Sequence, residues 1–164
     1  MKVLKIKKNS KIVGKFKILT HEAGTKNLIS ETDWIENTVS TASNHGLNLF
    51  IKHLFGDVTY ALPITRARFG TTDVTPVEAD SDIDSPLAYD IEIATRALIS
   101  NTEMEITFFA PNVYIPDDTY YTFSTYCSDR TFSMALIRDE NVSDFTKTGN
   151  VDTTIIYRYS IANA

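Results

Sequence analysis

The sequence of 164 residues contains one cysteine, Cys127, so no disulfide can form within the chain and no cysteine-rich zinc site can be built. It has three histidines, but no metal-binding spacing such as HExxH. No apolar run approaches the roughly 18 residues that a membrane span needs. The lysine-rich N-terminus also lacks the apolar stretch of a secretory signal. The sequence therefore predicts no membrane segment, no signal peptide and no metal cofactor.

Motifs of catalysis and cofactor binding are also missing. There is no GxSxG, no glycine-rich phosphate loop and no dinucleotide-binding fingerprint. Cys127 lies in a strand-like YCSDR stretch, and the sequence places no histidine beside it to act as a base. We therefore expect a buried structural cysteine, no cofactor and no enzymatic activity.

Hydrophobic residues make up 43% of the chain and charged residues 23%, which is typical of a globular domain with a real core. The net charge of −5 hides an asymmetry. Eight lysines and one acid, Glu22, occur within residues 1–26, which gives this segment a net charge of +7 and leaves −12 for the remainder. Such asymmetry indicates either a polyanion-binding arm or a basic strand that contacts an acidic face of another copy.

The basic segment alternates lysines with apolar residues in KVLKIKK and KIVGKFKIL, and Asn9-Ser10 between them is a turn signal. We therefore predict an N-terminal β-hairpin arm over residues 1–26, followed by one domain over residues 27–164. The same lysines can simply discourage aggregation at a strand edge. Nucleic-acid binding is disfavoured, because the segment contains no arginine and Phe16 is its only aromatic residue.

The middle of the chain predicts one helix over residues 43–56. Its apolar positions follow helical spacing, and we expect this face to pack on a sheet: Leu47, Phe50, Ile51, Leu54 and Phe55. Ser43 or Asn44 can cap its start, and Gly56 can end it.

After Pro63 the chain is predicted to consist of strands and loops. Five segments are rich in β-branched and aromatic residues: IEIATRALIS, EMEITFFA, YYTFSTYC, FSMALIRD and VDTTIIYRYSI. In the last segment, one face is formed by every second residue: Val151, Thr153, Ile155, Tyr157, Tyr159 and Ile161. Strands at this spacing predict a mainly β domain, a β-sandwich or jelly-roll-like fold with one amphipathic helix.

The stretch from residue 73 to residue 92 is acidic and contains no basic residue. Asp80, Asp82 and Asp84 alternate as in a calcium loop, but Ser85 and Ile91 stand where an EF-hand needs glycine and glutamate. We expect a solvated, ordered surface loop, and calcium binding by it is left open.

Three stretches, taken in order, resemble a group of small bacteriophage and prophage structural proteins, and the N-terminal attachment domains of some tail-collar fibres. They are ENTVSTASNHGLNLFIKHLFGD, ITRARFGTTDVTPVEADSDIDSPL and DFTKTGNVDTTIIYRYSI, and the resemblance covers roughly residues 33 to 162. It implies a virion component, assembled in the cytoplasm of the host bacterium, with no catalytic residues to carry over.

The predicted function is therefore to join, cap or decorate a phage tail (collar, fibre or baseplate) or capsid through oligomeric contacts with itself, as a trimer, and with other virion proteins. Charge complementarity suggests that the lysines meet the acidic loop of a neighbour. The candidate interface residues are Lys5, Lys7, Lys11, Lys15, Lys17, Asp80, Asp82 and Asp84.

One alternative is a carbohydrate-binding module for a host-surface glycan. It would use an exposed face of Tyr114, Tyr120, Tyr121 and Tyr126. The other is a nucleic-acid-binding protein, whose affinity would fall steeply with salt.

Overall fold

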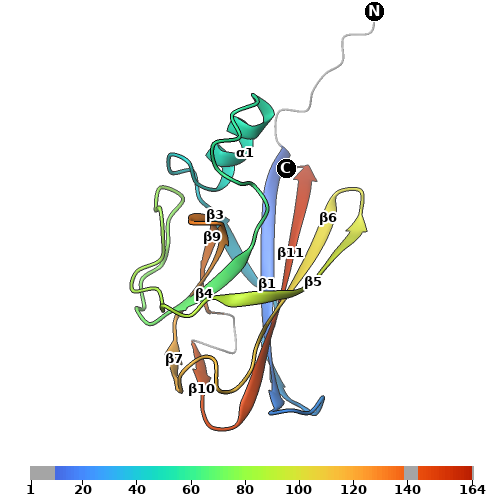
Figure 1. The fold of residues 1–164 in the computed structure, drawn as a ribbon, viewed down its shortest axis with the longest axis vertical. Coiled ribbons are helices and arrows are strands. Elements are labelled where there is room, and N and C mark those ends of the chain that lie inside the picture. Colours follow the sequence, from blue (N-terminus) through green and yellow to red (C-terminus); the bar gives the residue numbers. More distant parts are fainter. Residues whose placement is uncertain (1–9, 139–143, 164) are drawn as a thin grey trace, which may run out of the picture.

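The computed structural model describes residues 10–138 and 144–163, which fold into strands and a short helix (Figure 1). The elements within these residues are β1 (Ser10–Glu22), β2 (Leu28–Glu31), β3 (Ile35–Val39), α1 (Gly46–Leu54), β4 (Arg66–Gly70), β5 (Ile91–Ser100), β6 (Glu103–Ala110), β7 (Asp118–Tyr120), β8 (Thr122–Cys127), β9 (Arg130–Leu136), β10 (Phe145–Lys147) and β11 (Val151–Asn163).

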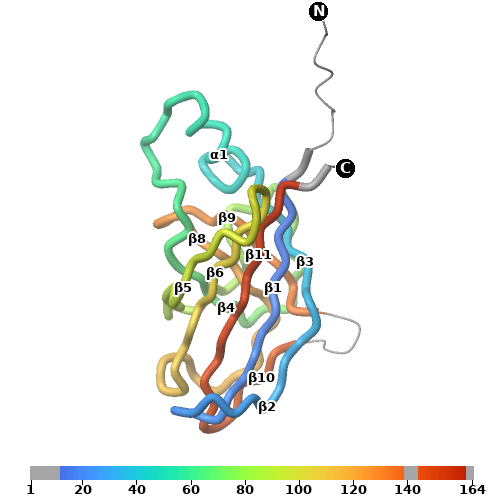
Figure 2. The backbone as a smooth tube through the Cα atoms, turned by 90° about the vertical axis from the view of Figure 1, so that its right-hand side faces the viewer, coloured from blue at the N-terminus to red at the C-terminus, as the bar shows by residue number. Residues whose placement is uncertain are grey.

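Among the described residues, eight strands close into an antiparallel barrel. The order around it is β1-β11-β6-β5-β4-β8-β9-β3, and β3 pairs with β1 again. β1 and β11 pair along their whole length, from Ser10 opposite Asn163 to Glu22 opposite Val151. β2 adds to the edge of β1, and β7 and β10 form a separate two-stranded ribbon at the end opposite α1 (Figures 1 and 2).

Aromatic side chains fill the barrel. The ring of Phe123 on β8 lies at the centre, 4.8 Å from Phe16, 5.5 Å from Phe69 and 6.2 Å from Tyr157, measured between ring centroids. These rings come from β1, β4, β8 and β11, whose alternate residues point inward as the period of a strand requires. Each of the four is at most 1% exposed.

A polar network lies inside the same core. The Ser133 hydroxyl oxygen lies 2.8 Å from that of Tyr157 and 2.7 Å from that of Tyr159, and Thr125 joins it at 2.7 Å. Burial raises the pKa of both tyrosines, so they stay neutral hydroxyls. The hydrogen bonds satisfy polar groups that would otherwise be costly to bury.

The prediction of a mainly β domain with one helix is confirmed for the described residues, but the strands close into a barrel instead of the predicted sandwich or jelly-roll. The full-length pairing of β1 with β11 joins edges that a sandwich would leave apart. The described part of the predicted hairpin arm, from Ser10 onward, is a barrel strand that buries Phe16 and Ile18. Its first nine residues lie outside the described residues.

The predicted helix is confirmed, but its predicted packing face is wrong at three of five positions, since Leu47 and Phe50 are partly buried and the other three are exposed. Leu49 is buried, whereas Ile51, Leu54 and Phe55 are 44%, 72% and 87% exposed. The reason lies at the first turn, where the Leu47 N–H donates to the Ser40 carbonyl oxygen and a Cβ on Gly46 would lie 2.1 Å from that oxygen. These contacts hold the first turn of the helix against the barrel, and the exposed residues lie on its second half and just after it.

Truncation of Phe123 tests the aromatic core. We expect Phe123→Ala to lower the free energy of unfolding by about 3–5 kcal/mol, because it leaves a cavity among packed rings. Phe109→Ala is the matched control, since Phe109 lies on β6 and is 40% exposed. Urea unfolding would measure both, and an equal loss in the two variants would contradict this account of the core.

Candidate assembly surface

The predicted interface lysines that the structure describes in full lie around one tryptophan on the outside of the barrel. The Nζ atoms of Lys15 and Lys17 are 5.0 and 5.6 Å from the ring centroid of Trp34, and the guanidinium carbon of Arg158 is 4.9 Å from it. Lys17 also pairs with Glu31 at 3.4 Å. These cations therefore already have partners within their own chain.

The structure describes no side-chain contact for the other three predicted interface lysines. Lys5 and Lys7 lie outside the described residues, and Lys11 lies in β1 without a described side chain. The structure does not bring the described lysines, Lys15 and Lys17, to Asp80, Asp82 or Asp84.

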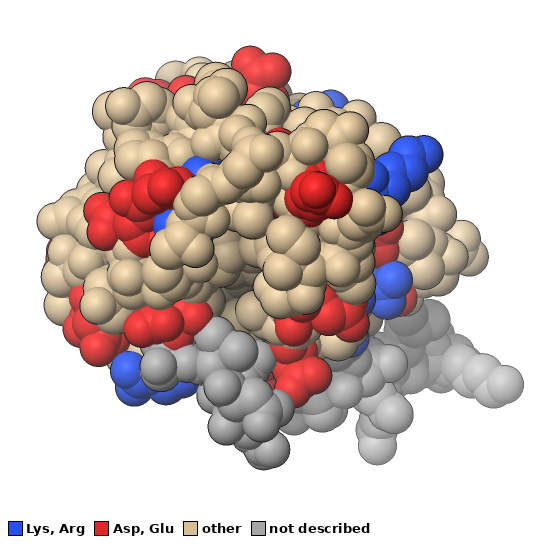
Figure 3. Space-filling model, turned by 90° about the horizontal axis from the view of Figure 1, so that it is seen from below, with Lys and Arg blue, Asp and Glu red and all other residues tan. Residues whose placement is uncertain are grey.

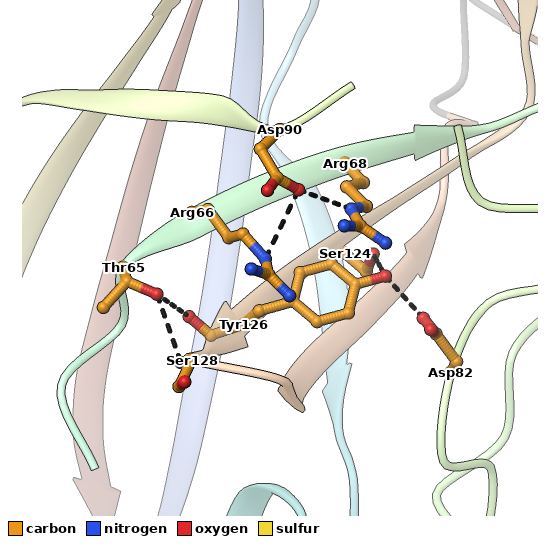
Figure 4. A network of polar contacts seen from close by, with 8 residues as sticks. All are labelled: Thr65, Arg66, Arg68, Asp82, Asp90, Ser124, Tyr126 and Ser128. Carbon is orange, nitrogen blue, oxygen red and sulfur yellow. Dashed lines mark hydrogen bonds and ion pairs between the residues drawn. The ribbon is translucent and has the colours of Figure 1, made fainter. Parts of the chain in front are cut away.

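The acidic loop is fastened to its own barrel by two of its carboxylates (Figure 4). The Tyr126 hydroxyl donates to Asp82 Oδ1 at 2.5 Å and accepts from Ser124 Oγ at 2.8 Å. Arg68 Nε donates to Asp90 Oδ1 at 2.6 Å. The loop is thus ordered, as predicted, and its charge is partly used in holding it.

Arg66 strengthens the same attachment. Its Nε lies 3.3 Å from Asp90 Oδ1, and its guanidinium carbon lies 5.4 Å from the ring centroid of Tyr126, with that of Arg68 at 5.3 Å. Burial raises the pKa of Tyr126 most, and the hydrogen bond to Asp82 raises it further. The Tyr126 hydroxyl therefore stays protonated and can donate to Asp82.

The spacing of Asp80, Asp82 and Asp84 does not produce a converging set of ligands. Asp80 Oδ2 accepts from the Val77 N–H at 2.8 Å, while Asp82 faces Tyr126. Within residues 10–138 and 144–163, no group of three or more histidine, cysteine or acidic side chains could hold a metal ion.

The attachment of the loop can be tested at Asp82. We expect Asp82→Ala to lower the free energy of unfolding by about 1.5–3 kcal/mol and to speed proteolysis within residues 73–90, because a charged hydrogen bond to a buried tyrosine is lost. Asp84→Ala is the control, because Asp84 is exposed and alternates with Asp82 on the same loop. Equal effects of the two variants would show that Tyr126 does not hold the loop.

One of the three histidines, His45, and the single cysteine are buried parts of the fold. His45 accepts a hydrogen bond from the Thr131 N–H at its Nδ1, 3.1 Å away, and so joins the start of α1 to β9. Burial lowers the pKa of His45 most, and the nearby positive charge of Arg130 lowers it further. Cys127 is buried, as predicted, and its Sγ lies 2.7 Å from the Leu62 carbonyl oxygen. Burial raises the pKa of this thiol to about 12, so it is not a nucleophile at neutral pH.

The tyrosine face proposed for a glycan is contradicted at two of its four positions. Tyr120 and Tyr126 are 0% and 2% exposed, and burial raises the pKa of Tyr120 to about 12. Tyr114 remains 40% exposed, and Tyr121 is partly buried. Four rings therefore do not form one exposed stacking face.

The lowered pKa of His45 predicts a pH dependence of stability. Because its folded pKa lies below the ordinary value of 6.5, the unfolded chain takes up a proton first, and stability is lost as the pH falls from 6.5 through the folded pKa. In His45→Asn the amide oxygen can accept from Thr131 without titrating. We expect urea unfolding at about pH 7.5 and about pH 5.5, on either side of the ordinary pKa, to show a smaller loss in this variant than in the wild type. An identical loss in both proteins would contradict a buried, neutral His45.

The most unusual surface lies at the α1 end of the barrel (Figures 1 and 2). Large apolar side chains are exposed on α1, on the turn after it and on the ends of β5, β6 and β11. We call them the apolar rim: Ile51, Leu54, Phe55, Val58, Leu98, Ile99, Met104 and Ile161, each at least 40% exposed. Large exposed apolar patches mark interaction sites in soluble proteins.

A cavity of about 470 Å³ opens within this rim. One side is the inner face of β11, β6 and β5, and the other is formed by α1 and the chain before β4. We call it the socket, and its main apolar residues are Phe50, Leu62, Leu98, Met104, Phe132 and Ile161. Barrel mouths are a common position for binding cavities.

The rim also contains an unpaired strand edge. β4 pairs with β5 only at Ile91 and Glu92, so from Ile93 to Ser100 the pairings described for β5 are all with β6. In contrast, acidic side chains stand around the opposite end of the barrel (Figure 3), where the turns contribute Glu22, Asp117 and Asp118. The two ends therefore differ in chemistry.

The sequence did not predict the rim, because most of its residues lie in segments where a buried position was expected. Leu54 and Phe55 fit a packed helix face, and Ile161 continued the alternation that buries Tyr159. The run ALIS at the end of β5 was a signal, since its apolar residues are adjacent and break the alternation.

The chain matches no known family, and neither a curated protein nor a solved structure is significantly similar to it. Within the described residues, no helix has the length and apolar character needed to cross a membrane.

Proposed function

We propose that this protein is a structural component of a bacteriophage particle, which joins, caps or decorates the tail or capsid through contacts made at the α1 end of its barrel. The observation that supports this most is the apolar rim, with Leu54 and Phe55 72% and 87% exposed. Burying such side chains against another protein is favourable, at about 25 cal/mol for each Å² of apolar surface removed from water.

The open edge of β5 supports the same role. Proteins that work as monomers usually protect such edges with charges, prolines or a covering element. Between Ile93 and Ser100 the only charged side chain is Arg96, which donates to the Ile64 carbonyl oxygen at 2.7 Å. An edge of this kind suits a protein whose contacts are completed in an assembly.

The virion setting rests on the sequence resemblance over residues 33 to 162. The resemblance supports assembly into a particle in the cytoplasm of the host bacterium, with itself, as a trimer, and other virion proteins as partners. A glycan-binding module is a weaker proposal, because Tyr120 and Tyr126 are not available to a sugar.

Immunogold electron microscopy would test the proposal. Antibodies against the purified protein should label a fixed position on phage particles produced by cells that carry the gene, and the protein should sediment with those particles. Particles from cells with the gene deleted provide the control. Particles without label, from which the protein separates in a density gradient, would contradict a virion role.

A further inference from the structure

The apolar rim has a projecting part and a hollow part. Leu54, Phe55 and Val58 project from the end of α1 and the turn after it, and Val58 is 70% exposed. We call these three residues the knob. The lining of the socket includes residues of α1 and of the β5–β6 hairpin, so it lies at the same end of the barrel. One chain therefore carries both an apolar projection and an apolar hollow on one end.

We infer that the socket of each chain receives the knob of a second copy, with Phe55 inserted between Leu98 and Phe50. This deepens the proposed function, on which it rests, by assigning the contact that holds copies together. Size permits it, because a cavity of about 150 Å³ already holds a benzene ring and the socket measures about 470 Å³. The knob does not fill its own socket in this structure, since Phe55 is 87% exposed.

Charges next to the two parts also suit the contact. Lys52 and Asp57 flank the knob with half-exposed side chains 4.0 Å apart. Arg96 and Glu103 stand at the socket. Each part is thus flanked by one cation and one anion, so the contact can place opposite charges together, which favours correct pairing over wrong partners.

The acidic character of the opposite end of the barrel also favours the α1 end as the surface through which copies meet. Acidic side chains cover more of that end than basic ones (Figure 3), so a contact between two such ends would be opposed by a net like charge. Any closed ring of copies joined at the α1 end, the expected trimer included, uses every knob and every socket once.

Cross-linking between two different variants tests the contact directly. Chains with Phe55→Cys are mixed with chains with Leu98→Cys and treated with a short bismaleimide. We expect a covalent dimer that contains one chain of each kind. The control mixture pairs Phe55→Cys with Val113→Cys, because Val113 is 88% exposed in the loop after β6 at the other end of the barrel. The buried thiol of Cys127 gives no background in the folded protein.

Association measured by sedimentation velocity provides a second test. Phe55→Asp should weaken self-association at least about tenfold, the change that corresponds to about 1.4 kcal/mol. Val113→Asp, equally exposed, should leave it unchanged. Circular dichroism would confirm that both variants remain folded.

Three results would overturn the inference. The first is an oligomer that Phe55→Asp leaves intact, with no cross-link between the Phe55→Cys and Leu98→Cys chains. The second is a full-length protein that stays monomeric at high concentration. The third is an oligomer lost only when residues 1–9 are removed, which would assign the contact to that segment. Labelled particles would still support a virion component in each case, although a monomeric protein would also remove the proposed trimer; unlabelled particles would contradict the virion role independently of this contact.

Discussion

The need to fill the barrel with side chains governs the rest of this structure. An eight-stranded barrel has an interior just wide enough to be packed by its own residues. Phe123 and the rings around it fill the middle, and the hydroxyls of Tyr157 and Tyr159 find partners in Ser133 and Thr125. The packed side chains inside the barrel end near Tyr159, but the strands β11, β6 and β5 continue beyond that level. The open mouth and its exposed apolar residues follow from that difference in length.

Composition made the strands predictable, but not their closure. The segments at residues 91–100 and 103–110 were predicted with the bounds that they have, because they are rich in the β-branched and aromatic residues that favour strands. Nothing local indicates that β1 pairs with β11, since that pairing joins residues far apart in the chain. The face of the helix was also misjudged, because amphipathic spacing shows which residues share a side and not whether another element covers it.

The candidate surface was less predictable than the fold. The acidic loop was expected to face a neighbour, yet Asp82 is held by Tyr126, which lies 44 positions away in the sequence. Asp152, a charged residue on the strand face opposite Tyr157, is only 7% exposed because it accepts from the backbone N–H groups of Gly24 and Asn112 in two turns. Such partners depend on tertiary structure, and charge composition alone does not identify them.

The pairing of β1 with β11 also sets the order of events during synthesis. β1 is made well before its partner along thirteen residue pairs, which follows only after about 130 further residues, or roughly ten seconds at typical rates of translation. Until then Phe16 and Ile18 lack the strand that completes their burial. The barrel therefore closes only after β11 has been made, and contacts between strands so far apart in the sequence form slowly and leave apolar residues exposed to aggregation in the meantime.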